Sequence, residues 1–114
     1  MFNANSVRLR ACRKRGGLDQ AELSQLIGTS YSTVSRFERG ESLPDIRHLI
    51  AYEIIFDIPV SKMLPDTSVA VRNQTRERAA RVLKRCRRSS DDRRRAIKVE
   101  FMEGLCRRLD GIKS

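Results

Sequence analysis

The sequence contains no tryptophan and few other aromatic residues, which together make up only 5% of its 114 residues. Long apolar runs are also missing, since none approaches the roughly 20 residues that a helix needs to cross a bilayer. Residues 1–5 are polar overall and show no apolar segment of the kind found in secretory signals. We therefore expect a cytoplasmic protein that has no membrane partner.

Histidine and cysteine, which are common in catalytic and metal sites, are scarce as well. The three cysteines, Cys12, Cys86 and Cys106, lie far apart and are odd in number, which does not fit a disulfide framework. His48 is the only histidine and has no cysteine near it, so neither a zinc site nor a Ser–His–Asp triad is expected. We therefore predict a protein that is not an enzyme and holds no metal or cofactor.

Acidic residues are in deficit, and the deficit is confined to one half of the chain. The whole sequence has 24 Lys+Arg and 14 Asp+Glu, a net charge of +10. Residues 1–66 contain 9 basic and 8 acidic side chains (+1), whereas residues 67–114 contain 15 basic and 6 acidic side chains (+9). A basic surface attracts polyanions without specifying a fold. Arg-rich helix faces that are simply solvated remain the alternative.

Glycines and capping residues divide the near-neutral part into short helices. The pattern predicts helices at 5–15, 20–27, 31–39 and 46–56, followed by a short turn at 60–64. Asp19, Ser30 and Asp45 are suitable N-caps, and Gly28 and Gly40 are suitable stops. No period-2 alternation persists, so no strand is predicted.

The basic part reads as two further helices. The first spans about 68–87, and Ser89 is the expected cap of the second, with Asp92 as its capping-box partner. The short connection predicts an antiparallel αα-hairpin. Apolar stripes are expected at Thr75, Ala79, Val82, Leu83 and Cys86 in the first helix and at Ile97, Phe101, Met102, Leu105, Leu109 and Ile112 in the second.

The helices at 20–27 and 31–39, joined by a tight turn with glycine, are typical of a helix-turn-helix. In this motif the second helix presents its N-terminal residues to base edges in the major groove. The 31–39 helix has two different faces. Val34 and Phe37 are expected in the core, beside Ala21, Leu23 and Ile27. The outer face is expected to hold Tyr31, Ser32, Ser35 and Arg36.

Residues 18–64 read LDQAELSQLIGTSYSTVSRFERGESLPDIRHLIAYEIIFDIPVSKML. This segment resembles the DNA-binding domain of phage repressor/Cro-type regulators, the XRE family. The resemblance covers residues from about 7 to 65 and depends on the joint spacing of Gln20, Leu23, Gly28, Val34, Glu38, Gly40 and Pro44. It implies an all-α chain: a five-helix lambda-repressor-like DNA-binding domain (residues 1–66), followed by a basic helical hairpin (residues 67–114).

The resemblance also implies roles for individual residues. The positions that meet base edges match Tyr31, Ser32, Ser35 and Arg36, and the guanidinium of Arg36 fits O6 and N7 of guanine. The positions that meet phosphates match Gln20, Thr33, Arg39, Ser42 and Arg47. Arg13 and Glu38 match a pair that links the first and third helices, so both are expected to be structural.

Three residues depart from the family pattern. Glu53 stands where a small residue is common, and we expect it at a rim or paired, because an unpaired buried carboxylate is costly. Asp57 stands where glycine is common and must tolerate a left-handed conformation. Cys12 replaces a usual leucine and is expected to pack as a small apolar residue.

These observations predict a sequence-specific transcriptional regulator, a repressor that binds double-stranded DNA at a near-palindromic operator as a homodimer, located at the nucleoid. One alternative is an antitoxin-type regulator whose hairpin also holds a partner protein, and another is a basic protein that coats nucleic acid without sequence choice. The hairpin itself has three open roles: dimerisation, packing onto the first and fifth helices of the same chain, or additional phosphate contacts.

Overall fold

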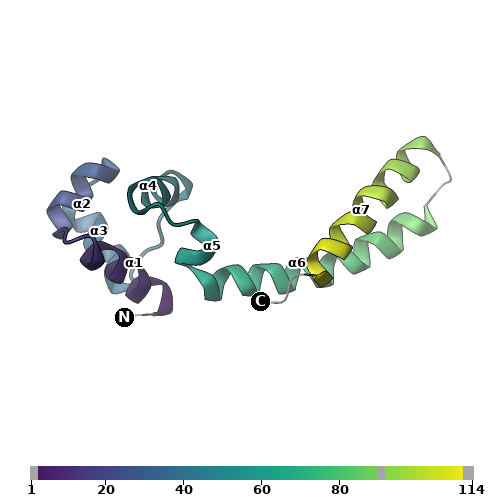
Figure 1. Cartoon of the computed structure of the whole chain (residues 1–114). Helices are drawn as coiled ribbons and strands as arrows, with labels where there is room; N and C mark the ends of the chain where they lie inside the picture. The colour runs from purple at the N-terminus through teal and green to yellow at the C-terminus, as the bar shows by residue number, and fades with distance from the viewer. Residues whose placement is uncertain (1–2, 90–91, 112–114) are drawn as a thin grey trace. The chain divides into compact units, whose positions relative to one another are not determined.

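The computed structural model describes residues 3–89 and 92–111, and the regular elements among them are all α-helices (Figure 1). They are α1 (Ala4–Arg15), α2 (Gln20–Ile27), α3 (Tyr31–Arg39), α4 (Ile46–Phe56), α5 (Val60–Met63), α6 (Pro65–Arg88) and α7 (Arg93–Gly111). The expectation of an all-α fold is therefore confirmed. None of these helices combines the length and the apolar character that crossing a bilayer requires.

Local signals set the ends of the first helices. The carboxylate of Asp19 accepts a hydrogen bond from Glu22 N at 2.7 Å, and Glu22 Oε1 accepts one from Asp19 N at 2.9 Å. This reciprocal capping box begins α2 as predicted. Ser30 and Asp45 each accept a backbone N–H at the start of α3 and α4. Gly28 ends α2 with φ of 85°, a conformation that residues with a Cβ rarely adopt.

The chain forms two compact units, and the boundary between them lies inside a helix. Unit 1 is Met1–Ser68 and unit 2 is Val69–Ser114. The sequence places the end of the first zone at Pro65 and Asp66, but Pro65 instead opens α6. Proline suits the first turn of a helix because its missing N–H would have no helical partner there.

Unit 1 has a closed apolar core to which α1 to α5 all contribute. Its buried members are Leu9, Cys12, Leu23, Val34, Phe37, Tyr52, Met63 and Leu64. Full burial of such a side chain contributes about 1.5–3 kcal/mol. Val34 and Phe37 therefore anchor α3 in this core. Ala21, which was expected beside them, is exposed.

Unit 2 is an antiparallel hairpin of α6 and α7, as predicted (Figure 1). The predicted cap of α7 is wrong: Ser89 Oγ donates to Cys86 O at 2.8 Å, whereas Asp92 Oδ1 accepts from Arg95 N at 2.8 Å. Because α7 begins at Arg93, only residue 92 occupies the capping position. In α6 the buried residues are Ala79 and Leu83, and α7 has none. Ile112 lies outside the described residues.

Candidate nucleic-acid interface

A tight turn at residues 28–30 connects α2 to α3 (Figure 1). Ser24 O accepts hydrogen bonds from Gly28 N at 2.9 Å and from Thr29 N at 3.0 Å, which closes α2. Ser30 Oγ then accepts from Thr33 N at 3.2 Å and starts α3. The turn is thus held by backbone hydrogen bonds at the end of α2 and by the Ser30 side chain at the start of α3.

The second helix of this motif, α3, has the two faces that its sequence predicts, with one exception. Val34 and Phe37 are buried. On the opposite side Tyr31 is 57% exposed, and Ser32 and Arg36 are exposed as well. A solvent-facing surface of α3 therefore has hydroxyl donors and an aromatic ring at its start and one guanidinium in its last turn.

A buried ion pair braces α3 from behind. Arg13 of α1 donates to both carboxylate oxygens of Glu38 in α3, at 2.7 Å from Nε and 2.9 Å from Nη2. Arg13 also donates to Leu18 O at 2.8 Å, and Gln20 Nε2 donates to Glu38 Oε1 at 3.1 Å. The hydrogen bond to Glu38 raises the pKa of Arg13, against the opposing effect of burial. The expected structural pairing of Arg13 and Glu38 is confirmed, and Gln20 joins it.

Ser35 is the exception on α3. Its expected position on the outer face is wrong, because it is only 9% exposed. Its Oγ accepts a hydrogen bond from Arg39 Nη1 at 2.9 Å, and Arg39 Nε also donates to Glu41. Ser35 therefore positions the Arg39 guanidinium at the end of α3. Sequence spacing alone missed this because serine suits either environment.

The hydroxyls at the start of α3 form a small network with Arg36. Ser30 Oγ lies 2.8 Å from Thr33 Oγ1 and 3.1 Å from Ser32 Oγ. Arg36 Nη2 donates to Thr33 Oγ1 at 3.4 Å, a long bond that the guanidinium could exchange for a base or phosphate. Thr33 is half-buried and so stands at the edge of the exposed surface.

The remaining predicted phosphate contacts follow α3 in sequence. Ser42 is half-buried in the loop, and Arg47 is exposed in the first turn of α4. Next to Arg47, His48 is half-buried, with Nδ1 3.2 Å from Asp45 Oδ1 and its ring 5.3 Å from that of Phe37. Within residues 3–89 and 92–111, no three His, Cys, Asp or Glu side chains gather in a way that could hold a metal ion.

The three departures from the family pattern fit the fold. Glu53 is exposed and accepts a hydrogen bond from Val60 N at 3.0 Å, so it ties α4 to the start of α5. Asp57 adopts the left-handed conformation with φ of 53° and ψ of 43°. Cys12 is buried in the core, and burial raises the pKa of its thiol. All three expectations are confirmed.

One surface of unit 1 was not anticipated from the sequence. Ile46, Ile50 and Ile54 recur every four residues along α4 and are all exposed. We call them the α4 stripe. The core side of α4 is instead formed by Tyr52, with Leu49, Ile55 and Phe56 packed partly against the core. The sequence predicted the helix correctly, but α4 has apolar residues on both sides, so the spacing of its apolar residues does not show which side is buried.

This geometry defines a helix-turn-helix domain, a class of module that places its second helix in the major groove of DNA. Comparison with known proteins agrees: the family model described as helix-turn-helix matches residues 9–63. The resemblance of this segment to XRE-type helix-turn-helix regulators is therefore confirmed.

One curated relative is similar over part of the chain. A candidate HTH-type transcriptional regulatory protein of Pyrococcus furiosus is 40% identical over 55 residues, which are 48% of this chain and 18% of the relative. The chain therefore spans less than a fifth of the length of that relative. No solved structure matches the chain.

Proposed function

We propose that this protein is a sequence-specific DNA-binding transcriptional repressor that inserts α3 into the major groove of a near-palindromic operator. The observation that carries the proposal is the division of α3 into a buried face and an exposed polar face that begins at the N-terminus of the helix. A helix held this rigidly loses little freedom when it binds, so its polar groups can serve base readout. The name of the Pyrococcus furiosus relative supports a role in transcription.

The proposal assigns base contacts to Tyr31, Ser32 and Arg36, because these side chains are exposed. Ser35 is assigned an indirect role through the hydrogen bond that it accepts from Arg39. Phosphate contacts are assigned to Thr33, Arg39, Ser42, Arg47 and Gln20. The Gln20 amide keeps its hydrogen bond to Glu38, while its second N–H contacts a phosphate of the DNA backbone. No catalytic step is part of this proposal, and its site of action is the nucleoid.

The proposal includes a homodimer, because two recognition helices about 34 Å apart read a palindromic site in one turn of DNA. The α4 stripe is the surface that we assign to the dimer, since residues 1–66 carry a net charge of only +1 and two copies would repel each other weakly. Stable interfaces bury about 800 Å² per partner, more than three isoleucines supply. The dimer should therefore be weak in solution and completed by binding both half-sites.

Selection of bound duplexes from a random pool tests the function directly. A repressor of this kind should enrich a two-fold-symmetric sequence and bind it about 10³–10⁷ times more tightly than random duplex. Enrichment of no sequence, together with a steep dependence on salt, would instead identify a protein that coats nucleic acid.

The selected operator then allows a test of the readout. Arg36→Ala should relax the preference at one base pair in each half-site and cost about 1–3 kcal/mol on the selected sequence. The matched control is Arg10→Ala, an exposed arginine of α1. An unchanged base preference in Arg36→Ala would remove Arg36 from the readout.

A further inference from the structure

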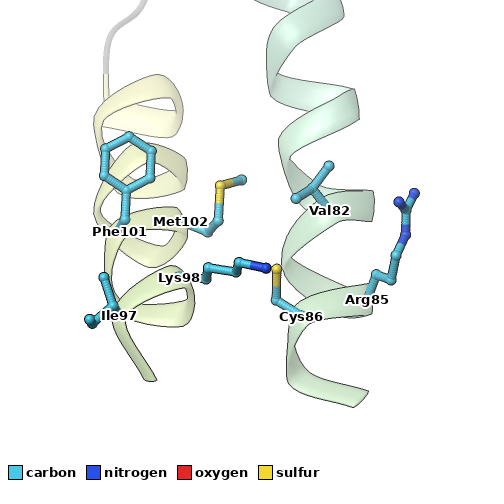
Figure 2. A pocket seen from close by; sticks show the side chains of 7 residues that line it. All are labelled: Val82, Arg85, Cys86, Ile97, Lys98, Phe101 and Met102. Atoms are coloured by element: carbon cyan, nitrogen blue, oxygen red, sulfur yellow. The ribbon is translucent and has the colours of Figure 1, made fainter. Parts of the chain in front are cut away.

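The hairpin of unit 2 contains an open groove lined mostly by apolar side chains. Val82 and Cys86 of α6 and Ile97, Phe101 and Met102 of α7 line it, with Arg85 and Lys98 as its charged members, and its volume is about 490 Å³. Met102, Lys98 and Cys86 point into the space between the two helices (Figure 2). Phe101 and Ile97 project from α7 without reaching α6 (Figure 2).

Unit 2 does not cover this groove with its own described residues. Phe101 is 63% exposed and Ile97 is 61% exposed. An exposed patch of large apolar side chains rimmed by charges is typical of an interaction surface. Met102 adds an unbranched, adaptable side chain, which suits the packing of a partner helix.

Charge decides which occupant suits the groove. Residues 67–114 carry a net charge of +9, and of the acidic side chains on α7, Glu103 is already bound to Arg87 at 2.7 Å. A second copy of the hairpin would cover the apolar side chains but would bring another nine positive charges against the first nine. A DNA duplex would neutralise the arginines but would leave Phe101 and Ile97 uncovered, because its backbone is polar.

We propose that this groove binds an acidic amphipathic helix of another protein. Such a helix places apolar side chains at i, i+3, i+4 and i+7 into the groove, in the helix-in-groove mode of recognition. Its flanking carboxylates would meet Arg85 and Lys98, which stand beside the apolar side chains. This inference does not depend on whether unit 1 binds DNA, because every residue in it belongs to unit 2.

The test uses the full chain and a designed peptide of about five helical turns, with leucines on one stripe and glutamates elsewhere. Two control peptides keep its length: one has the same composition in scrambled order, and the other has lysine in place of glutamate. Fluorescence anisotropy should show binding of the acidic amphipathic peptide, with at least about tenfold weaker binding of either control. Equal binding of the scrambled peptide would reduce the interaction to charge alone and overturn the proposal, as would no binding at all.

Variants of the chain locate the binding. Phe101→Lys and Ile97→Lys each add one positive charge but remove an apolar contact, and each should weaken binding at least about tenfold. Val71→Lys is the matched control, because Val71 is an exposed apolar residue of α6 that does not line the groove. All three positions are exposed, so the hairpin should keep its helical circular dichroism. Unchanged binding in both groove variants would overturn the assignment.

Two other measurements identify the competing occupants. If light scattering shows that Phe101→Lys abolishes a dimer that Val71→Lys retains, the groove holds a second copy and the proposal is wrong. If Phe101→Lys, unlike Val71→Lys, weakens binding to random duplex DNA, the groove serves nucleic acid and the proposal is equally wrong.

Discussion

The two units of this protein are both helical, yet they differ in how completely they bury their apolar side chains. Unit 1 collects side chains from five helices into one closed core, and it also buries the charged pair of Arg13 and Glu38. Unit 2 buries only Ala79 and Leu83 among its described residues and leaves Phe101 and Ile97 in solvent. A helix pair has too few faces to enclose a core, so unit 2 presents an apolar surface that another molecule can cover.

The two units also differ in net charge. Unit 1, which carries the helix-turn-helix, is nearly neutral, whereas unit 2 has almost the whole positive excess of the chain. Sequence-specific reading needs a few well-placed groups, while a high net charge gives affinity for any polyanion. Under the two proposals, base readout lies in unit 1, whereas the positive charge of unit 2 attracts an acidic partner protein.

The largest expected effect is on the free energy of unfolding, when one ion pair is broken in each unit. Glu38→Ala leaves the buried Arg13 without its partner and should lower the free energy of unfolding by about 3–5 kcal/mol. Glu103→Ala breaks the exposed pair with Arg87 and should cost no more than about 1 kcal/mol. Urea denaturation of both variants measures the difference. Similar losses would contradict the contrast between the units.

The second effect compares the two exposed apolar surfaces. Ile50→Glu places two carboxylates at the proposed dimer contact and should weaken binding to the full operator by about tenfold or more, with binding to a single half-site unchanged. Phe101→Lys, in the groove of unit 2, should leave both affinities within about twofold. Titrations of full and half operators measure these values, and the reverse pattern would move the dimer contact to the hairpin.

The third effect separates phosphate contacts in unit 1 from the arginines of the hairpin. Arg39→Ala should weaken binding to every sequence alike and reduce the slope of log affinity against log salt by about 1. Arg78→Ala removes an exposed arginine of α6 and should leave that slope unchanged if the charge of the hairpin serves a protein partner. A reduced slope in Arg78→Ala would mean that the hairpin contacts the phosphates of the DNA.

The smallest effect concerns a polar atom inside the core of unit 1. Tyr52 Oη is buried and has no hydrogen-bond partner among the residues that the structure describes. Burial, and then the charge of Glu38, raise the pKa of Tyr52. Tyr52→Phe should leave the free energy of unfolding unchanged or raise it by up to about 1 kcal/mol in thermal or urea denaturation. A clear loss of stability would mean that the hydroxyl is hydrogen-bonded in solution.

Several features of the fold and site could be predicted from the sequence because their causes are local. The bounds of α2, α3 and α4 match the prediction, since the caps and glycines that set them act within one helical turn. The burial of Val34 and Phe37 followed from their spacing. The pairing of Arg13 with Glu38, which are 25 positions apart, followed only from the family resemblance.

The tertiary structure decided which side chains are buried where local sequence could not. It turned Ser35 inward onto Arg39, and it chose the Tyr52 side of α4 for the core, leaving the α4 stripe exposed. It also left the groove of the hairpin open. Spacing along one helix defines which residues share a face, but which face is covered depends on the helices that pack against it. The sequence by itself therefore determined the helices and the separation of charge, and packing between helices determined which surfaces are left exposed.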